Sequence, residues 1–213
     1  MRSIAFGMAM AGAIGKHYIF VALVMSSFVL VALLVFSIVQ PAWCLWPAPQ
    51  PNDPAWRFRL LVHRASGVLI ALTGLGALGL AVLDRSSLGL SAPPRWLLGS
   101  GLLIFGATFG LSGYIQLGVA RSQGVPGPLE ARGAYRYSRN PQYVGAIGVL
   151  LGFGLLSGSK LGLLAGTACS VWFLTAPFAE EPWLHRHLGS RYDEYLRTTP
   201  RFLGLPKQGK ESE

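Results

Sequence analysis

The chain alternates between long apolar stretches and short polar connections. Four apolar runs, at residues 18–39, 60–83, 96–120 and 161–179, are each about as long as the roughly 20 helical residues that cross a hydrocarbon core. A fifth run, at 143–156, is too short to cross alone, so we expect it to pair with the last long run through the turn at 157–160. The pattern therefore predicts an all-α, polytopic membrane bundle of about five transmembrane helices, the last two forming a short hairpin.

The two halves of the chain differ in where their polar residues lie. Residues 1–120 contain the first three apolar runs, and 121–213 contain the hairpin with polar segments at both ends and an amphipathic tail. We interpret them as an amino-terminal group of transmembrane helices and a carboxyl-terminal core. The apolar residues 3–15 precede Lys16 and His17, and we expect them to lead into the first helix along the membrane interface rather than to form a cleaved signal peptide.

Composition agrees with a membrane protein and excludes two other classes. Of 213 residues, 52% are apolar and 13% are charged, and the mean hydropathy is +0.45. This apolar content excludes a disordered chain, and two cysteines are too few for a disulfide scaffold. Cys44 lies in a connection and Cys169 lies within an apolar run, so we expect both to be unpaired thiols.

The basic residues predict how the chain is oriented. Most of the 18 lysines and arginines lie in the first loop, the third loop and the tail, which five crossings place on one side of the membrane. By the positive-inside rule that side is cytosolic, so the amino terminus is outside and the carboxyl terminus is cytosolic. This arrangement and anionic headgroups account for most of the net charge of +9, so the charge does not argue for nucleic-acid binding.

Two polar segments, at 121–143 and 180–201, flank the hairpin on its cytosolic side. The hairpin therefore brings them together. In the first segment, Pro141 suits the first turn of a helix with Asn140 as its cap, which would place Arg139, Asn140 and Tyr143 around free helix amides that attract anions. The alternative interpretation is a positively charged interfacial loop anchored by tyrosines.

The second segment opens with two adjacent carboxylates, Glu180 and Glu181, directly after an apolar run. The carboxyl end of a helix disfavours negative charge, so such a pair needs a partner. We expect Glu181 to cap a new helix beginning at Pro182, with an apolar stripe formed by Leu184, Leu188, Tyr192, Tyr195 and Leu196. Glu180 has no capping role, which leaves two interpretations of the pair: capping at the interface or binding a cation.

Other patterns predict packing rather than chemistry. Glycines recur at four-residue spacing at Gly106 and Gly110 and again at Gly148 and Gly152, as expected for helices in close contact. His185 and His187 are two residues apart on the tail helix, so they do not share a face and form a poor metal site. We therefore predict no metal centre.

Three motifs together resemble the isoprenylcysteine carboxyl methyltransferase and phospholipid methyltransferase superfamily. They are the segment 133–145 with its Arg139-Asn140-Pro141 turn, the Glu180-Glu181 pair, and the tail with Gly189-Ser190-Arg191-Tyr192 and Pro200-Arg201-Phe202. Gly99-Ser100-Gly101 and Glu180-Glu181-Pro182 look like the phospholipid branch, whereas Tyr192, Tyr195 and Arg201 look more like the carboxyl methyltransferases. The resemblance covers the carboxyl-terminal half, from the third apolar run onward.

The resemblance implies S-adenosylmethionine as cofactor and a lipophilic acceptor that enters from the bilayer. It implies cofactor-binding roles for Gly99, Gly101, Tyr135, Asn140, Pro141, Tyr143, Gly145, Glu180 and Glu181. It implies catalytic roles for Glu180, Arg139 and Arg201, and contacts between the acceptor and Arg201, Tyr192 and Tyr195. A carboxylate held by Arg201 or Arg139 is the expected acceptor, with an isoprenylcysteine-like group as the example, because arginines outnumber spare bases.

Three alternatives remain open at the level of sequence. Phospholipid amine methylation is close behind and needs a base within reach of the amine. A haem-associated isomerase-like relative would use a buried histidine such as His63. A non-catalytic scaffold would bind anionic lipids through the basic face, but it leaves Glu180 and Glu181 without a role.

Overall fold

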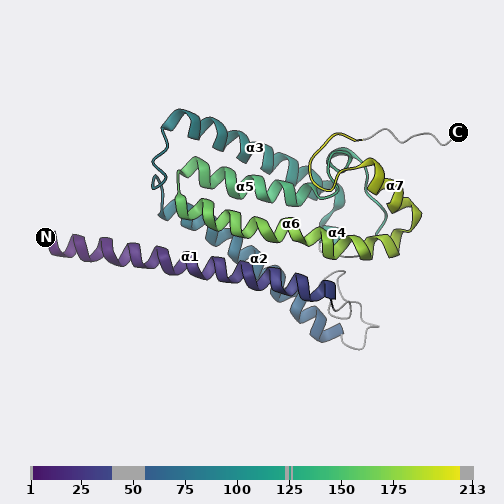
Figure 1. The fold of residues 1–213 in the computed structure, drawn as a ribbon, viewed down its shortest axis with the longest axis horizontal. Helices are drawn as coiled ribbons and strands as arrows, with labels where there is room; N and C mark the ends of the chain where they lie inside the picture. Colours follow the sequence, from purple (N-terminus) through teal and green to yellow (C-terminus); the bar gives the residue numbers. More distant parts are fainter. Residues whose placement is uncertain (1, 40–55, 123–124, 126, 207–213) are drawn as a thin grey trace.

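A computed structural model describes residues 2–39, 56–122, 125 and 127–206 of the chain. Cys44 lies outside these residues. The described part is all-helical (Figure 1), which confirms the predicted fold class. Its elements are α1 Arg2–Val39, α2 Trp56–Leu83, α3 Ala92–Leu117, α4 Val119–Ser122, the 3-10 helix η2 Gly133–Arg136, α5 Pro141–Ser157, α6 Lys160–Leu188 and α7 Ser190–Thr198.

The helices match four of the predicted spans and the short fifth element. Gly12–Ala32, Leu60–Leu83, Ala92–Leu117 and Lys160–Leu188 are long and apolar enough to cross a membrane, and Pro141–Ser157 is a shorter apolar helix. The chain is thus a membrane protein of several crossings. The segment 3–15 forms no separate element, since α1 is one continuous helix from Arg2. The in–out orientation of the termini stays a prediction.

Helices α3 and α5 pack backbone against backbone. At glycine positions their surfaces are so close that added Cβ atoms would collide: one at Gly106 would lie 2.7 Å from Val149 N, and one at Gly99 would lie 2.6 Å from Leu156 N. In a bilayer the hydrophobic effect does not drive helices together, so their association depends on close van der Waals packing. Small residues such as glycine allow the two backbones to approach closely enough for that packing. The short α5 is thereby held along the side of the longer α3 (Figure 1), which confirms the packing role predicted for Gly106 and Gly148.

Substitutions at two α3 glycines test this packing. A Cβ at Gly101 would meet no atom within 4 Å, unlike one at Gly106. We expect Gly106→Ala to destabilise the protein by about 1–3 kcal/mol through overpacking. Gly101→Ala should be neutral or stabilising by up to about 1 kcal/mol, because alanine favours helix. Thermal unfolding of the two purified variants in one detergent measures the difference, and equal melting temperatures would contradict the packing.

The turn between α5 and α6 is clamped by the connection that follows α2. Gly158, with φ +66°, closes α5, and the side chain of Ser159 caps α6 by accepting from Gly162 N. Buried Asp84 accepts hydrogen bonds from Ser159 Oγ at 2.9 Å and from Leu161 N at 3.0 Å. The turn predicted at 157–160 is confirmed, and Asp84 joins it to α2.

Asp84 makes stability depend on pH at the acid end. Burial opposes its charge, but hydrogen bonds from Ser87, Leu161 and Ser159 outweigh burial and lower the pKa of Asp84. A lowered folded-state pKa adds stability above the unfolded value of about 3.9 that is lost as pH falls through the folded value. We expect the melting temperature of the wild type to fall below about pH 4, and Asp84→Asn to lose this dependence while melting lower at pH 7. Parallel profiles for both proteins would contradict the clamp.

Helix α6 corrects the prediction for Glu181 and Pro182. No new helix begins at Pro182: α6 continues through Pro177 and Pro182 to Leu188, so Glu181 lies inside it and caps nothing. Each internal proline removes one backbone hydrogen bond, which membrane helices tolerate when neighbours compensate. The helix ends at Gly189, with φ +60°, which divides the predicted apolar stripe between α6 and α7.

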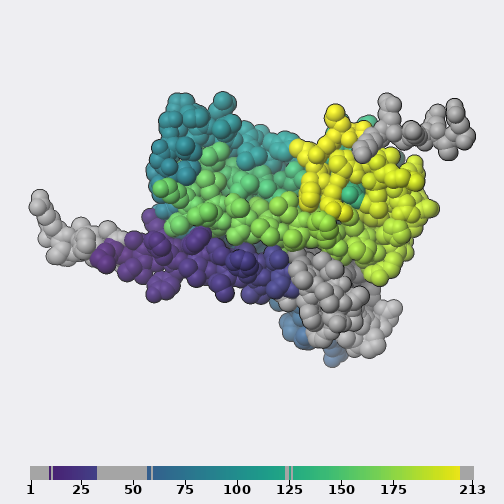
Figure 2. All heavy atoms as spheres, in the orientation of Figure 1, coloured from purple at the N-terminus to yellow at the C-terminus, as the bar shows by residue number. Residues whose placement is uncertain are grey.

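The third span also ends earlier than predicted, at Leu117 rather than Ala120. Gly118 has φ +79° and its N–H donates to Tyr114 O, which closes α3 before the short α4 begins. Figure 1 shows α4, α7, the carboxyl end of α1 and the start of α2 at one end of the bundle, opposite the α5–α6 turn. In Figure 2 the carboxyl-terminal residues, in yellow, cover that end.

Candidate functional site

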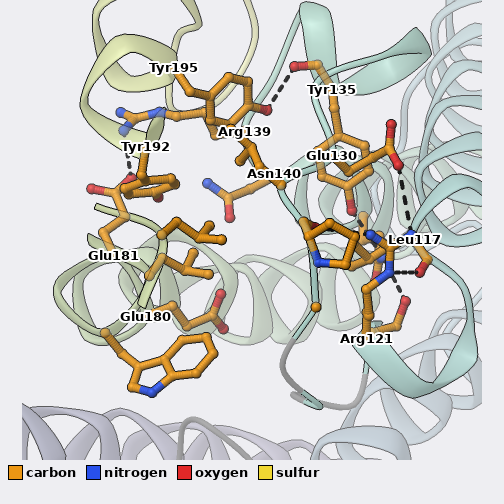
Figure 3. Close-up of a pocket in the computed structure, with 18 of the residues that line it drawn as sticks. Leu117, Arg121, Glu130, Tyr135, Arg139, Asn140, Glu180, Glu181, Tyr192 and Tyr195 are labelled. Atoms are coloured by element: carbon orange, nitrogen blue, oxygen red, sulfur yellow. Dashed lines mark hydrogen bonds and ion pairs between the residues drawn. The ribbon is translucent and has the colours of Figure 1, made fainter. Parts of the chain in front are cut away.

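A pocket lies beside the carboxyl-terminal part of α6, around Glu180 and Glu181. Its volume is about 870 Å³, including the open space at its mouth. The two polar segments predicted to meet both contribute to it (Figure 3). Its lining consists of Leu117, Arg121, Ser122, Val125, Gly127, Pro128, Leu129, Glu130, Tyr135, Arg139, Asn140, Gln142, Tyr143, Glu180, Glu181, Trp183, Leu184, Leu188, Tyr192 and Tyr195. We call this space the end pocket.

Glu180 is the carboxylate of the end pocket that has no cationic partner. Tyr143 OH donates to Glu180 Oε1, and among the described residues no ion pair to Glu180 is found. The ring of Tyr143 packs at 5.8 Å, centroid to centroid, on Trp172 and at 5.7 Å on Phe173. These contacts fix the tyrosine, which in turn orients Glu180, so a buried carboxyl group without an ionic partner among the described residues faces the pocket.

Glu181, one residue on, is already paired with two arginines. Arg201 donates to it in a bidentate pair, from Nε to Oε1 at 2.9 Å and from NH2 to Oε2 at 2.6 Å. Arg139 NH1 lies 3.2 Å from Glu181 Oε1. The hydrogen bonds to Glu181 raise the pKa of Arg201. Glu181 is therefore neutralised by its neighbours, and the adjacent carboxylates have different surroundings.

Arg139 retains unused hydrogen-bonding capacity. Its side chain is 10% exposed; within the described part of the chain its buried Nε makes no hydrogen bond, and its NH1 makes only the ion pair with Glu181. Burying such donors costs about 1–3 kcal/mol each if nothing accepts from them. The guanidinium lies at the wall of the end pocket, so it is suited to an anionic or carbonyl group of a ligand.

Arg121 organises the loop that covers one side of the end pocket. Its guanidinium donates to Leu117 O at 2.7 Å, Gln116 O at 3.2 Å and Pro128 O at 3.1 Å, and it lies 3.7 Å from Glu130. One side chain thus joins the end of α3 to the loop that follows it (Figure 3).

Three buried tyrosines form another wall. Tyr195 OH donates to Tyr135 O at 2.7 Å, which joins α7 to η2. Burial raises the pKa of Tyr135 to about 12 and raises the pKa values of Tyr192 and Tyr195 above the usual range. All three phenols are neutral near pH 7, so they supply aromatic surface and hydrogen bonds rather than a base.

The carboxyl-terminal segment is tied to the start of α5. Arg139 N donates to Pro200 O at 2.9 Å, and Gly204 N donates to Tyr137 O at 3.0 Å. Asn140 is at the cap position of α5, but its side chain makes no capping bond. Its Nδ2 instead donates to Arg201 O at 2.9 Å. The predicted capping by the Asn140 side chain is wrong because the amide serves this tertiary contact.

The structure brings most of the predicted site residues together, but not all. Tyr135, Arg139, Asn140, Tyr143, Glu180, Glu181, Tyr192 and Tyr195 line the end pocket, and Arg201 contacts it through Glu181. Pro141 and Gly145 do not line it: a Cβ on Gly145 would strike the backbone of Gly110, and the Pro141 side chain packs at Gly113. Gly99 packs near the opposite end of α5, against Leu156, and neither it nor Gly101 lines the pocket.

Several lining residues were missed by the sequence analysis. Gln142 donates to Tyr135 OH at 3.2 Å and to Ser122 Oγ at 2.9 Å. Arg121 and Glu130 lie within the polar segment 121–143 but were not predicted as site residues. Their opposite charges nine residues apart were the signal available, but the contact depends on how the intervening loop folds. Trp183 gave no signal beyond an aromatic residue at an interface.

The comparison with known families agrees with this geometry. The sequence model of the phospholipid methyltransferase family matches residues 94–191, from the start of α3 to the start of α7. No curated protein and no solved structure matches the chain significantly. The matched part contains Arg139, Glu180 and the helices that position them. Residues 94–191 therefore carry the pattern of the phospholipid methyltransferases, a family of membrane methyltransferases, and this confirms the resemblance stated above.

Proposed function

We propose that this protein is a membrane methyltransferase that transfers the methyl group of S-adenosylmethionine to a lipophilic acceptor. One observation carries the proposal: Glu180 and Arg139, from the two polar segments, line one pocket at the end of the bundle. The family match supports the reaction class. By the distribution of basic residues, we place the end pocket on the cytosolic side.

The polar groups of the end pocket fit those of S-adenosylmethionine. The cofactor has a carboxylate, an ammonium and a sulfonium. Glu180, without a cationic partner, suits the ammonium, and the face of Tyr143 favours the sulfonium. Arg139, with its unused donor, suits one anionic group, either the carboxylate of the cofactor or that of a carboxylate acceptor. Glu181 is excluded from the ammonium role because Arg201 and Arg139 already neutralise it.

When bound, S-adenosylmethionine supplies an electrophilic methyl group. The protein's own residues then have to hold both reactants in line and keep water away. Positioning of this kind can lower a barrier by roughly 7–11 kcal/mol. The rigid elements around the end pocket suit that role: Tyr143 is packed on Trp172 and Phe173, and Tyr195 locks α7 onto η2.

Two acceptor classes each have a supporting observation. A carboxylate, as in an isoprenylcysteine, is already a nucleophile and needs an arginine. Arg139 fits that need better than Arg201, which binds Glu181 and lies 4.2 Å over the Phe178 ring. A phospholipid amine must first lose a proton, and Glu180, the lining carboxylate without a cationic partner among the described residues, is the candidate to accept it in place of pairing with the cofactor ammonium. The name of the matching family favours this second class.

Methyl-labelled S-adenosylmethionine added to membranes containing the protein tests the reaction and separates these acceptors. We expect label in the lipid fraction, absent from membranes without the protein. Mild base then releases labelled methanol from a methyl ester and leaves label on a methylated amine. Purified wild type that neither binds the cofactor nor labels any lipid would refute the proposal.

A further inference from the structure

Residues 200–206, which follow α7, form no helix and lie outside every candidate membrane span. They are nevertheless a fixed part of the fold. Arg139 N donates to Pro200 O at 2.9 Å, and Gly204 N donates to Tyr137 O at 3.0 Å. Figure 2 shows this segment, in yellow, on the outside of the bundle. We call residues 200–206 the strap.

Arg201 places the strap at the edge of the hydrocarbon core. Its guanidinium lies 4.2 Å over the ring of Phe178, which is exposed on α6 within a candidate membrane span. Phe178 follows Lys160, the first residue of α6, by 18 residues, or about 27 Å of helix. A charged Lys160 suits the opposite membrane surface, and the hydrocarbon core is about 30 Å thick. The strap therefore crosses the side of α6 where hydrocarbon gives way to headgroups.

At this depth the strap directs two leucines away from the protein. Leu203 is 56% exposed and Leu205 is 82% exposed. Tyr137, which is bonded to the strap through its carbonyl, is exposed as well. Leucine gains free energy when it leaves water for an apolar environment, and tyrosine is enriched at membrane interfaces. The three side chains thus have the composition of a surface that rests in the interface.

Arg136 adds a positive charge beside this apolar surface. It directly precedes Tyr137 at the end of η2 and is exposed. Among the described residues, no ion pair to Arg136 is found. Basic residues next to an interfacial apolar surface attract anionic headgroups. Arg136 is therefore placed to bind the phosphate of an anionic lipid.

Lipid fits this surface better than a second protein does. Phe178, under the guanidinium of Arg201, lies on the part of α6 that the bilayer surrounds. The surface formed by Leu203 and Leu205 continues from that contact at the same depth. A soluble partner would have to reach the level of the headgroups to cover it, whereas lipid is already present there.

We propose that the strap is an interfacial anchor: Leu203 and Leu205 insert between the headgroups of the leaflet nearest the end pocket, and Arg136 binds an anionic lipid. The inference does not depend on the proposed reaction. It does have a consequence for the end pocket, because Asn140, which lines that pocket, donates to Arg201 O at 2.9 Å. An anchored strap holds the end pocket at headgroup level.

The experiment measures the depth of the strap in full-length protein that carries Cys44→Ser. Cys169 is buried and is left in place. A nitroxide label is attached at Leu205→Cys, at Leu174→Cys on the exposed side of α6, or at Glu194→Cys on the exposed side of α7. Protein without an added cysteine gives the blank.

Each labelled protein is reconstituted in phosphatidylcholine vesicles with or without phosphatidylglycerol. Power saturation of the electron spin resonance signal compares collisions of the label with oxygen, which concentrates in hydrocarbon, and with a nickel chelate, which stays in water. The ratio of the two collision rates reports the depth of the label. Arg136→Gln tests the charge, and Arg85→Gln, an exposed arginine in the connection after α2, is its matched control.

We expect the oxygen-to-nickel ratio at position 205 to be roughly threefold or more above that at 194 and below that at 174, as for an interfacial segment. Phosphatidylglycerol should raise the ratio at 205. Arg136→Gln should abolish most of this rise, because one arginine near an anionic surface shifts such an equilibrium about fivefold. Arg85→Gln should leave the rise unchanged.

Equal ratios at positions 205 and 194 would place the strap in water and overturn the inference. Spin–spin broadening at 205 that disappears on dilution with unlabelled protein would make the occupant a second copy of the chain, and would overturn it too. A rise with phosphatidylglycerol that Arg136→Gln and Arg85→Gln leave equally intact would overturn the role of Arg136.

Discussion

Glu180→Gln will weaken S-adenosylmethionine binding roughly ten- to hundredfold and lower methyl transfer at least as much. The substitution keeps the shape of the side chain and its contact with Tyr143, but it removes the negative charge proposed to bind the cofactor ammonium. Hydrogen bonds to charged groups contribute about 1.5–3 kcal/mol, and about 1.4 kcal/mol corresponds to a tenfold change in affinity. Equilibrium binding of labelled cofactor to purified protein in detergent measures the effect.

Glu130→Gln is the matched control for this prediction. Glu130 also lines the end pocket, but it lies 3.7 Å from Arg121 and so has a cationic partner in the protein. We expect its affinity for the cofactor to change less than threefold. Equal losses in the two variants would mean that the pocket needs negative charge only in general, and unchanged binding in Glu180→Gln would remove Glu180 from the site.

Glu181→Gln will chiefly destabilise the protein. It leaves Arg139, 10% exposed, and Arg201, 32% exposed, without a negative partner. Removing one member of a buried ion pair costs about 3–5 kcal/mol, and the partial exposure of Arg201 places the expectation at the lower end, about 3 kcal/mol. Thermal unfolding in detergent should show a melting temperature several degrees lower.

Arg201→Gln distinguishes an ion-pair network from simple loss of packing. If the two residues act through their bidentate contact, the double variant Glu181→Gln, Arg201→Gln should cost at least about 1 kcal/mol less than the sum of the single variants. Additive losses would contradict the pairing. Rescue by Arg201→Lys should be incomplete, because lysine cannot form the bidentate geometry.

The membrane fold could be predicted from hydropathy because span length and helix geometry are fixed by the bilayer. Less local features could not. Pro182 after Glu181 has the sequence of a helix start, yet α6 continues to Leu188. A proline predicts a helix end only when nothing else holds the backbone, and here the packed neighbours of α6 do. The glycine at 189, not the proline, ends the helix.

The candidate site was predictable as two segments but not as individual roles. Adjacent polar segments at both ends of a hairpin have to meet, so Arg139, Asn140, Tyr143 and Glu180 could be placed together. The different surroundings of Glu180 and Glu181 could not be foreseen. They depend on Arg201, twenty residues from Glu181, returning beside it to form the bidentate pair.

Gly99 and Gly101 show the limit of motif reasoning. Residue types alone fit both a packing surface and a cofactor motif, and the sequence left both interpretations standing. In the structure the backbone of Leu156 occupies the space that a side chain at position 99 would need. Close packing against α5 therefore explains the glycine.

Direct photochemical labelling of the protein by S-adenosylmethionine tests the central claim, that the segments 121–143 and 180–201 share one cofactor pocket. Irradiation of wild type with labelled cofactor, followed by peptide mapping, should place the label on peptides from both segments. Excess unlabelled cofactor and Glu180→Gln should each reduce it. Label confined to one segment, or found instead on the peptide that contains Gly99 and Gly101, would contradict the account.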